Sequence, residues 1–255
     1  MKSVLITGAS RGIGRALALE YSSKGASVVL LARNVDALRE LTHEIKARGG
    51  TAYYQRCDVA DIEQMRAAVA YAKKCLGRVD LAILNAGAGA PEWMDEFSTA
   101  TLRGVYDANL FGLAHGLEFL IPLMRKQGGG VIAGVSSLAD ARGYPGSAAY
   151  CSSKAAASTL LESARIELHP FGIRVVNVRP GFVRTDMTAK NEFYMPFLLE
   201  TERAARIIRR RIAMGCSVVQ FPLPVALATR FIRLLPNWLF DRMIRSSRPK
   251  RNVSL

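Results

Sequence analysis

The sequence contains few of the residues that build metal sites and disulfides. It has four cysteines and three histidines among its 255 residues, and neither set shows the spacing of a metal-binding motif. Free thiols without a partner at motif spacing are typical of proteins in a reducing compartment. We therefore expect neither a metal nor a disulfide framework from Cys57, Cys75, Cys151 and Cys216.

Long uncharged apolar runs are also missing. No stretch reaches the roughly 18 residues that a membrane-spanning helix needs. The first apolar run begins at residue 3, which leaves no room for a signal peptide before it. The chain has no internal repeat, low-complexity segment or evident linker, and with 50% hydrophobic and 22% charged residues it can bury one large core. We expect a single-domain protein located in the cytoplasm.

Acidic residues are scarce, at 21 against 35 Lys and Arg, and the formal charge of +14 is unevenly spread. Residues 203–255 hold twelve Lys or Arg and one acid, Asp241, a net charge of +11 that leaves +3 for residues 1–202. Large apolar residues are interleaved with these cations, and Pro236 divides the region into two short segments. We expect residues 1–222 to form the main domain and 223–255 to form a basic amphipathic helical extension that is not an independent domain.

Three interpretations of this extension remain open. Its helices can pack over a substrate cleft or a subunit interface, with the arginines in solvent. Alternatively, Trp, Phe and Leu side chains beside cations can lie on an anionic membrane through residues 223–251. Nucleic-acid binding is the least favoured, because the cations lack a recognised reading motif.

Strand-like apolar runs alternate with helical stretches along the chain. Alternating strands and helices favour an α/β fold, with a parallel sheet covered by helices on both faces. The runs that are typical of strands are Ser3–Ile6, Ser27–Leu31, Thr51–Arg56, Leu81–Leu84, Val131–Val135, Arg174–Val178 and Ser217–Phe221.

The first of these runs leads directly into a glycine-rich turn. Gly8, Gly12 and Gly14 have the spacing Gly-x-x-x-Gly-x-Gly, and an amphipathic stretch follows them. Glycines let the backbone turn sharply and approach a pyrophosphate, whose charge the N–H groups of the next helix bind. The position between strand and helix favours a dinucleotide site over a purely structural turn.

Tyr150 and Lys154 are the pair most indicative of chemistry. Helical residues four apart share a face, with Cβ atoms roughly 5–6 Å apart, so the ammonium can lie beside the phenol and stabilise the phenolate. Ser137, thirteen residues before Tyr150, supplies a hydroxyl. Hydride addition to a carbonyl builds negative charge on oxygen, where a hydroxyl donor and a proton source must converge. Taken alone, the Tyr150/Lys154 spacing favours a solvated surface pair, and the glycine-rich turn at the start of the chain is what supports the chemical interpretation.

Together these motifs resemble the short-chain dehydrogenase/reductase family, up to about Pro222. The resemblance implies a single-domain, Rossmann-like, three-layer fold with about seven parallel strands. It also implies an enzyme that moves a hydride between a nicotinamide and a carbonyl or hydroxyl carbon. The residues that carry it are Thr7 to Gly14, Asn85-Ala86-Gly87, Asn109, Ser137, Tyr150, Lys154 and Pro180-Gly181.

The resemblance further implies a role for each catalytic residue. Tyr150 is the general acid/base, and Ser137 hydrogen-bonds the reacting oxygen. Lys154 binds the nicotinamide ribose and lowers the Tyr150 pKa, while Asn109 completes a proton relay through water. Ser136 is the rival of Ser137, but the separation from the tyrosine favours Ser137 and leaves Ser136 as a strand-end hydroxyl.

Other positions are implied to contact the cofactor. Asp58 and Val59 match the place where the family holds the adenine, and Pro180 to Thr185 resembles the loop that contacts the nicotinamide carboxamide. The full set is Gly8, Ser10, Arg11, Gly12, Ile13, Gly14, Arg33, Asp58, Val59, Asn85, Ala86, Gly87, Tyr150, Lys154, Pro180, Gly181, Val183 and Thr185.

The end of the second expected strand favours NADP(H) over NAD(H). An NAD site usually has an acidic residue there, which accepts a hydrogen bond from the ribose 2′-hydroxyl, whereas this chain has Ala32 followed by Arg33. Arg11 adds a second cation for a 2′-phosphate. Asp36 is interpreted as a first-turn helix residue.

The family's substrate loop falls at Asp186–Glu200, which is rich in apolar residues. We expect an NADP(H)-dependent, homo-oligomeric oxidoreductase whose carbonyl or alcohol substrate is hydrophobic or lipid-like, although the loop residues can equally be core or oligomer contacts. The alternative is an NADP(H)-binding sensor or scaffold that acts through the basic extension. The complete set of Ser137, Tyr150 and Lys154 argues against that alternative.

Overall fold

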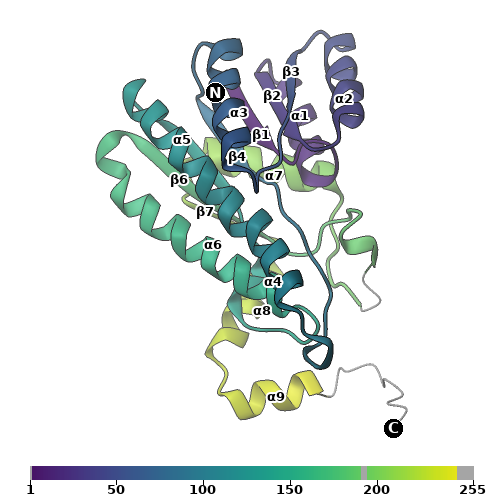
Figure 1. The fold of residues 1–255 in the computed structure, drawn as a ribbon. Coiled ribbons are helices and arrows are strands. Elements are labelled where there is room, and N and C mark those ends of the chain that lie inside the picture. The colour runs from purple at the N-terminus through teal and green to yellow at the C-terminus, as the bar shows by residue number, and fades with distance from the viewer. Residues whose placement is uncertain (1, 191–193, 246–255) are drawn as a thin grey trace.

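The computed structural model describes residues 2–190 and 194–245 and arranges them in three layers (Figure 1). The middle layer is a sheet of seven parallel strands in the order β3-β2-β1-β4-β5-β6-β7. The expected α/β fold class is confirmed, and each predicted strand lies within two residues of an observed one. The strands are β1 (Ser3–Thr7), β2 (Ser27–Ala32), β3 (Thr51–Arg56), β4 (Leu81–Leu84), β5 (Gly130–Val135), β6 (Ile173–Pro180) and β7 (Val218–Phe221).

Helices cover both faces of the sheet (Figure 1). One face is covered by α1 (Gly12–Ser22), α2 (Val35–Ala47) and α7 (Thr201–Ala213). The other is covered by α3 (Ile62–Leu76), α5 (Gly112–Lys126) and α6 (Ala148–Glu167). Successive strand residues point to opposite faces, so Val4 packs in the first core and Leu5 in the second. The central strands β1, β2, β4 and β5 are therefore mostly apolar, as strands buried on both faces require, whereas the edge strand β3 ends in Gln55 and Arg56.

The strand order reverses direction between β1 and β4, which are both central. In open parallel sheets, ligands bind beyond the carboxyl ends of the strands at such a reversal. A short helix, α4 (Thr99–Tyr106), follows β4, and a π-helical turn at Asp107–Phe111 joins it to α5. This turn brings Asn109 into the interior, where it is 3% exposed.

The described part of the C-terminal extension is helical, as expected. It consists of α8 (Leu223–Leu234) and α9 (Asn237–Arg245), which flank Pro236. Only Ala226 and Phe240 of these helices are buried among the described residues, and α9 lies at the end of the molecule far from the N-terminus (Figure 1). Residues 246–255 of the predicted extension lie outside the described residues. Among the helices that the structure describes, none is long and apolar enough to cross a membrane.

Candidate active site

A cleft of about 380 Å³ opens beyond the carboxyl ends of the strands. Every residue predicted to be catalytic or to contact the cofactor lines it, except Gly14 and Asn109. Several lining residues that were not predicted are chain neighbours of predicted ones, and Met187 belongs to the expected substrate loop. The lining residues that sequence reasoning did not assign to the cofactor or catalytic set are Ala32, Asn34, Cys57, Ala88, Ala108, Val135, Ser136, Asp186, Met187 and Thr188.

The glycine turn between β1 and α1 has the shape that a dinucleotide needs. Gly8 has a φ of +65°, and a Cβ there would lie 2.8 Å from the Ala86 Cα. A Cβ at Gly14 would overlap the Gly8 carbonyl oxygen, so α1 begins against the end of β1 only because both residues are glycine. Arg11, the residue before α1, makes no side-chain cap, which leaves the first N–H groups of the helix without a side-chain acceptor from that position. These features fit the pyrophosphate of a nicotinamide dinucleotide.

Asn85 fixes the end of β4 against the end of β1. Its side-chain Nδ2 donates to the carbonyl oxygens of Thr7 (3.1 Å) and Gly8 (3.3 Å). The Thr7 hydroxyl accepts from the backbone N–H groups of Asn85 and Ala86, both at 3.0 Å. Asn85 therefore supports the glycine turn from below and holds Gly87 at the floor of the cleft.

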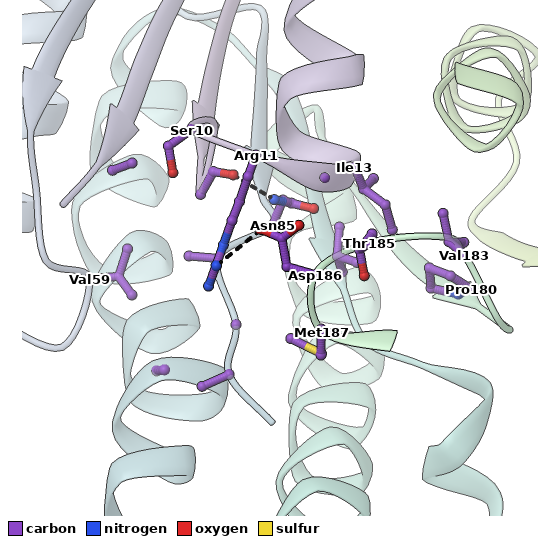
Figure 2. Close-up of a pocket in the computed structure, with 18 of the residues that line it drawn as sticks. Ser10, Arg11, Ile13, Val59, Asn85, Pro180, Val183, Thr185, Asp186 and Met187 are labelled. Atoms are coloured by element: carbon purple, nitrogen blue, oxygen red, sulfur yellow. Dashed lines mark hydrogen bonds and ion pairs between the residues drawn. The ribbon is translucent and has the colours of Figure 1, made fainter. Parts of the chain in front are cut away.

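The loop after β6 folds over the glycine turn (Figure 2). Arg11 Nη1 lies 3.2 Å from Asp186 Oδ2, and a Cβ at Gly12 would meet the Thr185 Cγ2 at 3.1 Å. Thr188 stiffens this loop, because its hydroxyl donates to the Val183 carbonyl oxygen at 2.7 Å. The glycine turn and the loop after β6 thus form two sides of the cleft, although they are about 175 residues apart in sequence.

At the far end of the cleft, Arg33 faces Asp58 across the ends of β2 and β3. Their side chains are 3.7 Å apart, and that of Arg33 is 74% exposed. An ion pair this long and this open is weak, so the guanidinium remains available to an anionic ligand. Ala32, the last residue of β2, occupies the position where an NAD site usually has an acidic residue, so no carboxylate comes from that position.

Lys154 lies across the face of the Tyr150 ring, with Nζ 5.7 Å from the ring centre. Both residues are in α6, one turn apart, as the spacing predicted. The expected lowering of the tyrosine pKa is wrong for this structure. Burial raises the Tyr150 pKa above its ordinary value, and hydrogen bonding with Ser137 offsets only part of that rise.

Lys154 is itself buried, at 4% exposure. Its Nζ donates to the Val135 carbonyl oxygen at 2.9 Å, which fixes the ammonium at the end of β5. Burial lowers the Lys154 pKa to about 8, although the charge of Asp140 acts in the opposite direction. A Cβ at Gly87 would lie 3.2 Å from this nitrogen, so the glycine leaves the room that Lys154 occupies.

The two consecutive serines after β5 have different surroundings. Ser137 Oγ accepts from the Ala139 N–H at 3.1 Å, so its own proton is free to donate toward Tyr150. Ser136 Oγ donates to the Lys154 carbonyl oxygen at 2.9 Å and is 3% exposed. This geometry supports the choice of Ser137 and gives Ser136 the task of anchoring α6.

A buried ion pair behind the site was not predicted. Asp140, whose side chain is 3% exposed, pairs with Arg179 of β6. The Ser158 hydroxyl of α6 bonds to Asp140 Oδ2 at 2.5 Å and to Ser136 Oγ at 2.7 Å. The loop that carries Ser137 is therefore tied to both α6 and β6. No local pattern around Asp140 indicates this pairing.

Asn109 lies beneath the cleft floor and does not line the cleft. Its Oδ1 accepts from the Ala88 N–H at 2.8 Å, and its Nδ2 donates to the Ala88 carbonyl oxygen (3.0 Å) and to Ser153 Oγ (2.9 Å). The side chain thus holds the segment after Gly87 against α6. The role of Asn109 in a proton relay stays a prediction.

The predicted substrate loop begins at the rim of the cleft. A Cβ at Gly89 would lie 3.4 Å from Met187 Sδ and 3.8 Å from Tyr150 Cδ2, so both side chains border Gly89. Tyr194 and Phe197 are 87% and 60% exposed, whereas Leu199 is buried. Phe193 of the predicted loop lies outside the described residues. Among the described residues, no cluster of His, Cys, Asp or Glu could hold a metal ion.

The arrangement suits proton transfer at a carbonyl or hydroxyl oxygen. A protonated phenol and a serine hydroxyl lie together, and a lysine ammonium lies behind them. The glycine turn and the cleft extend from this place toward Arg33, so a bound dinucleotide can bring its nicotinamide end to Tyr150.

Comparisons with known proteins agree with this chemistry. A sequence profile of the short chain dehydrogenase family matches residues 2–193. An uncharacterized oxidoreductase of Myxococcus xanthus is 40% identical over 251 residues, which cover 97% of this chain and 98% of that protein. The 7alpha-hydroxysteroid dehydrogenase of Escherichia coli K12 is 38% identical over 185 residues, 72% of each chain. A solved structure of a 7 alpha-hydroxysteroid dehydrogenase, complexed with NADH and 7-oxo glycochenodeoxycholic acid, has a TM-score of 0.80 at 32% identity and covers 86% of this chain and 92% of that one.

Proposed function

Since this chain belongs to the short-chain dehydrogenase/reductase family and is an oxidoreductase of alcohol or carbonyl groups, we propose that it uses NADP(H) to reduce an apolar ketone. The observation that carries the proposal is the meeting of Tyr150, Ser137 and Lys154 at one end of a dinucleotide-shaped cleft.

The residues act together on the substrate oxygen. A bound nicotinamide supplies the hydride. As negative charge develops on the carbonyl oxygen, Tyr150 donates its proton to that oxygen and Ser137 donates a hydrogen bond to it. Lys154, held by the Val135 carbonyl oxygen, keeps a positive charge behind the phenol.

The raised pKa of Tyr150 keeps its phenol protonated at neutral pH. A phenol with a raised pKa stays protonated, which is the form that a proton donor needs. Oxidation of an alcohol requires the phenolate, which becomes populated only at higher pH.

The choice of NADP(H) is supported by Arg33 and Ala32. Arg33 is exposed at the end of the cleft that lies far from Tyr150, and Ala32 leaves that end without the acidic acceptor of an NAD site. Arg11, also on the cleft wall, adds a second cation, although Asp186 lies 3.2 Å from it.

The choice of an apolar substrate is supported by the rim and by the relatives. Met187 and Tyr150 both border Gly89 and line the cleft, and the exposed Tyr194 and Phe197 follow Met187 in the same loop. The hydroxysteroid dehydrogenase that resembles this chain is named for an apolar polycyclic substrate.

The proposal is tested by NADPH oxidation with a panel of cyclic, steroid and long-chain ketones. We expect turnover of at least one ketone, and a loss of about 10²-fold or more in kcat for Tyr150→Phe with cofactor binding retained. Tyr21→Phe is the matched control, because the Tyr21 hydroxyl is buried without a hydrogen-bond partner in the described part of the chain. Equal activity of Tyr150→Phe and the wild type would remove the catalytic assignment, whereas tight NADPH binding without turnover would favour a sensor.

A further inference from the structure

The outward face of α8 and α9 carries a stripe of large apolar side chains. Their spacing of four, four, three and four residues follows the helical repeat, so those in α8 lie on one side of that helix. Contiguous exposed apolar residues of this kind mark an interaction surface. The stripe consists of Leu223, Leu227, Phe231, Leu234 and Trp238, which are 58–79% exposed.

Cations border this apolar stripe. Arg230, Arg233 and Arg242 are exposed, and none of their side chains makes an ion pair or hydrogen bond within residues 2–190 and 194–245. Between residues 203 and 255 the sequence has one acid, Asp241. The face therefore combines apolar bulk with positive charge that the described part of the protein does not neutralise.

The face is held rigidly against the active-site loop. Arg142, five residues after Ser137, donates to the carbonyl oxygens of Ile232 (3.3 Å) and Leu235 (2.6 Å) at the end of α8. It also donates to Asn237 Oδ1 at 2.7 Å and stacks on the Phe240 ring at 4.2 Å. A guanidinium on the last carbonyls of a helix is favourable for both hydrogen bonding and the helix dipole. Among the described residues, the inner side of α8 and α9 is thus occupied, whereas the outer side is exposed.

We propose that the apolar stripe and the three arginines form a docking face for an anionic lipid bilayer. The boundary of a bilayer offers acyl chains to Leu227, Phe231 and Trp238 and anionic headgroups to arginines at the edge of the same helix. The docked helices lie in the plane of the boundary, with Arg142 fixing the orientation of the Ser137 loop above it. An apolar ketone dissolved in the bilayer would then be concentrated near the docked enzyme, a consequence that rests on the proposed function.

Two other occupants fit the same face less well. A second copy related by a two-fold axis would bring this arginine-bearing surface against itself, and residues 203–255 contain a single acid to offset the repulsion. Nucleic acid would attract the arginines, but its phosphates would leave Phe231 and Leu234 in water.

The test is sedimentation of the full chain with extruded vesicles, in which no turnover is measured. We expect recovery with vesicles of phosphatidylcholine plus phosphatidylglycerol, and much weaker recovery with phosphatidylcholine alone. The double variant Phe231→Ser/Trp238→Ser should bind at least about tenfold more weakly. The double variant Arg230→Gln/Arg233→Gln should lose the preference for the anionic vesicles.

A matched control uses exposed apolar residues outside the extension. Ile166 and Met214 are 62% and 71% exposed, and Ile166→Ser/Met214→Ser should bind vesicles as the wild type does. Thermal unfolding and NADPH binding show that each variant is folded. The proposal is overturned if Phe231→Ser/Trp238→Ser binds anionic vesicles like the wild type. It is also overturned if that variant changes a dimer into a monomer without changing vesicle binding, or if duplex DNA binds more tightly than vesicles.

Discussion

Lys154 Nζ lies 5.7 Å from the centre of the Tyr150 ring, over its face, while it donates its hydrogen bond to the Val135 carbonyl oxygen. The two side chains therefore share a face of α6 as their spacing predicted, but the ammonium is committed to the backbone. Burial then controls both groups, raising the pKa of the phenol and lowering that of the lysine to about 8.

The first prediction concerns pH. Reduction needs Tyr150 protonated and Lys154 charged, so kcat/KM for ketone reduction should be level through neutral pH and should fall above pH 8, where Lys154 loses its proton. Oxidation of the product alcohol needs the phenolate and should rise with pH in the neutral range. Initial rates in both directions across pH measure this, and a reduction rate that increases steadily above pH 8 would contradict it.

The second prediction concerns Asp140. Its charge raises the Lys154 pKa, so Asp140→Asn should move the alkaline fall in reduction to lower pH. The substitution also leaves Arg179 without its buried partner, which should cost about 3 kcal/mol of unfolding free energy. Ser158→Ala is the control: it removes a hydrogen bond to Asp140 but keeps the ion pair, and should cost about 1 kcal/mol without moving the pH profile. Equal pH profiles for Asp140→Asn and wild type would show that this charge does not reach Lys154.

Most of the fold could be predicted because each buried strand is a local run of apolar residues bounded by turn residues. The glycine turn and the Tyr150/Lys154 pair are likewise local patterns. The features that the sequence did not predict correctly depend on residues that are distant in sequence. Asp140 meets Arg179 because Asp140 follows β5, Arg179 lies in β6, and these two strands are adjacent in the sheet. The Tyr150 pKa depends on burial, which the spacing of residues in the sequence does not reveal.

The third prediction concerns Gly87. A Cβ there would lie 2.8 Å from Asn109 Oδ1 and 3.2 Å from Lys154 Nζ, and both are held by other hydrogen bonds. Gly87→Ala should therefore displace Lys154, lower kcat by about tenfold or more and cost about 1–3 kcal/mol of stability. Gly104→Ala is the matched control, because a Cβ at this exposed position in α4 meets nothing within 4 Å. It should be neutral or stabilising by about 0.5–1 kcal/mol. Equal kcat and Tm for Gly87→Ala and Gly104→Ala would contradict the inference that Asn109 and Lys154 leave no room for a Cβ at position 87.

The fourth prediction concerns the cofactor. Arg33→Gln should raise the KM for NADPH by about tenfold, since a hydrogen bond to a charged group contributes about 1.5–3 kcal/mol, and should change the KM for NADH little. Arg39→Gln is the control, because Arg39 is an exposed arginine of α2 that pairs with Asp36 outside the cleft. A parallel rise in both KM values for Arg33→Gln would mean that the residue does not distinguish the two cofactors.

The fifth prediction concerns Arg142, the residue that joins the active-site loop to the extension. Replacing it with Gln removes the donors to Ile232 and Leu235 and the stacking on Phe240. The last carbonyls of α8 then lose their cationic partner, so amides of residues 223–245 should exchange with solvent about tenfold faster or more, as a loss of about 2 kcal/mol implies. Arg165→Gln is the control, since Arg165 makes only a 4.0 Å ion pair on the surface of α6. If exchange in α8 and α9 is the same in both variants, apolar packing around Ala226 and Phe240 holds the extension without Arg142. If exchange increases and the KM for the ketone rises while the KM for NADPH does not, the extension positions the substrate side of the cleft through this one arginine.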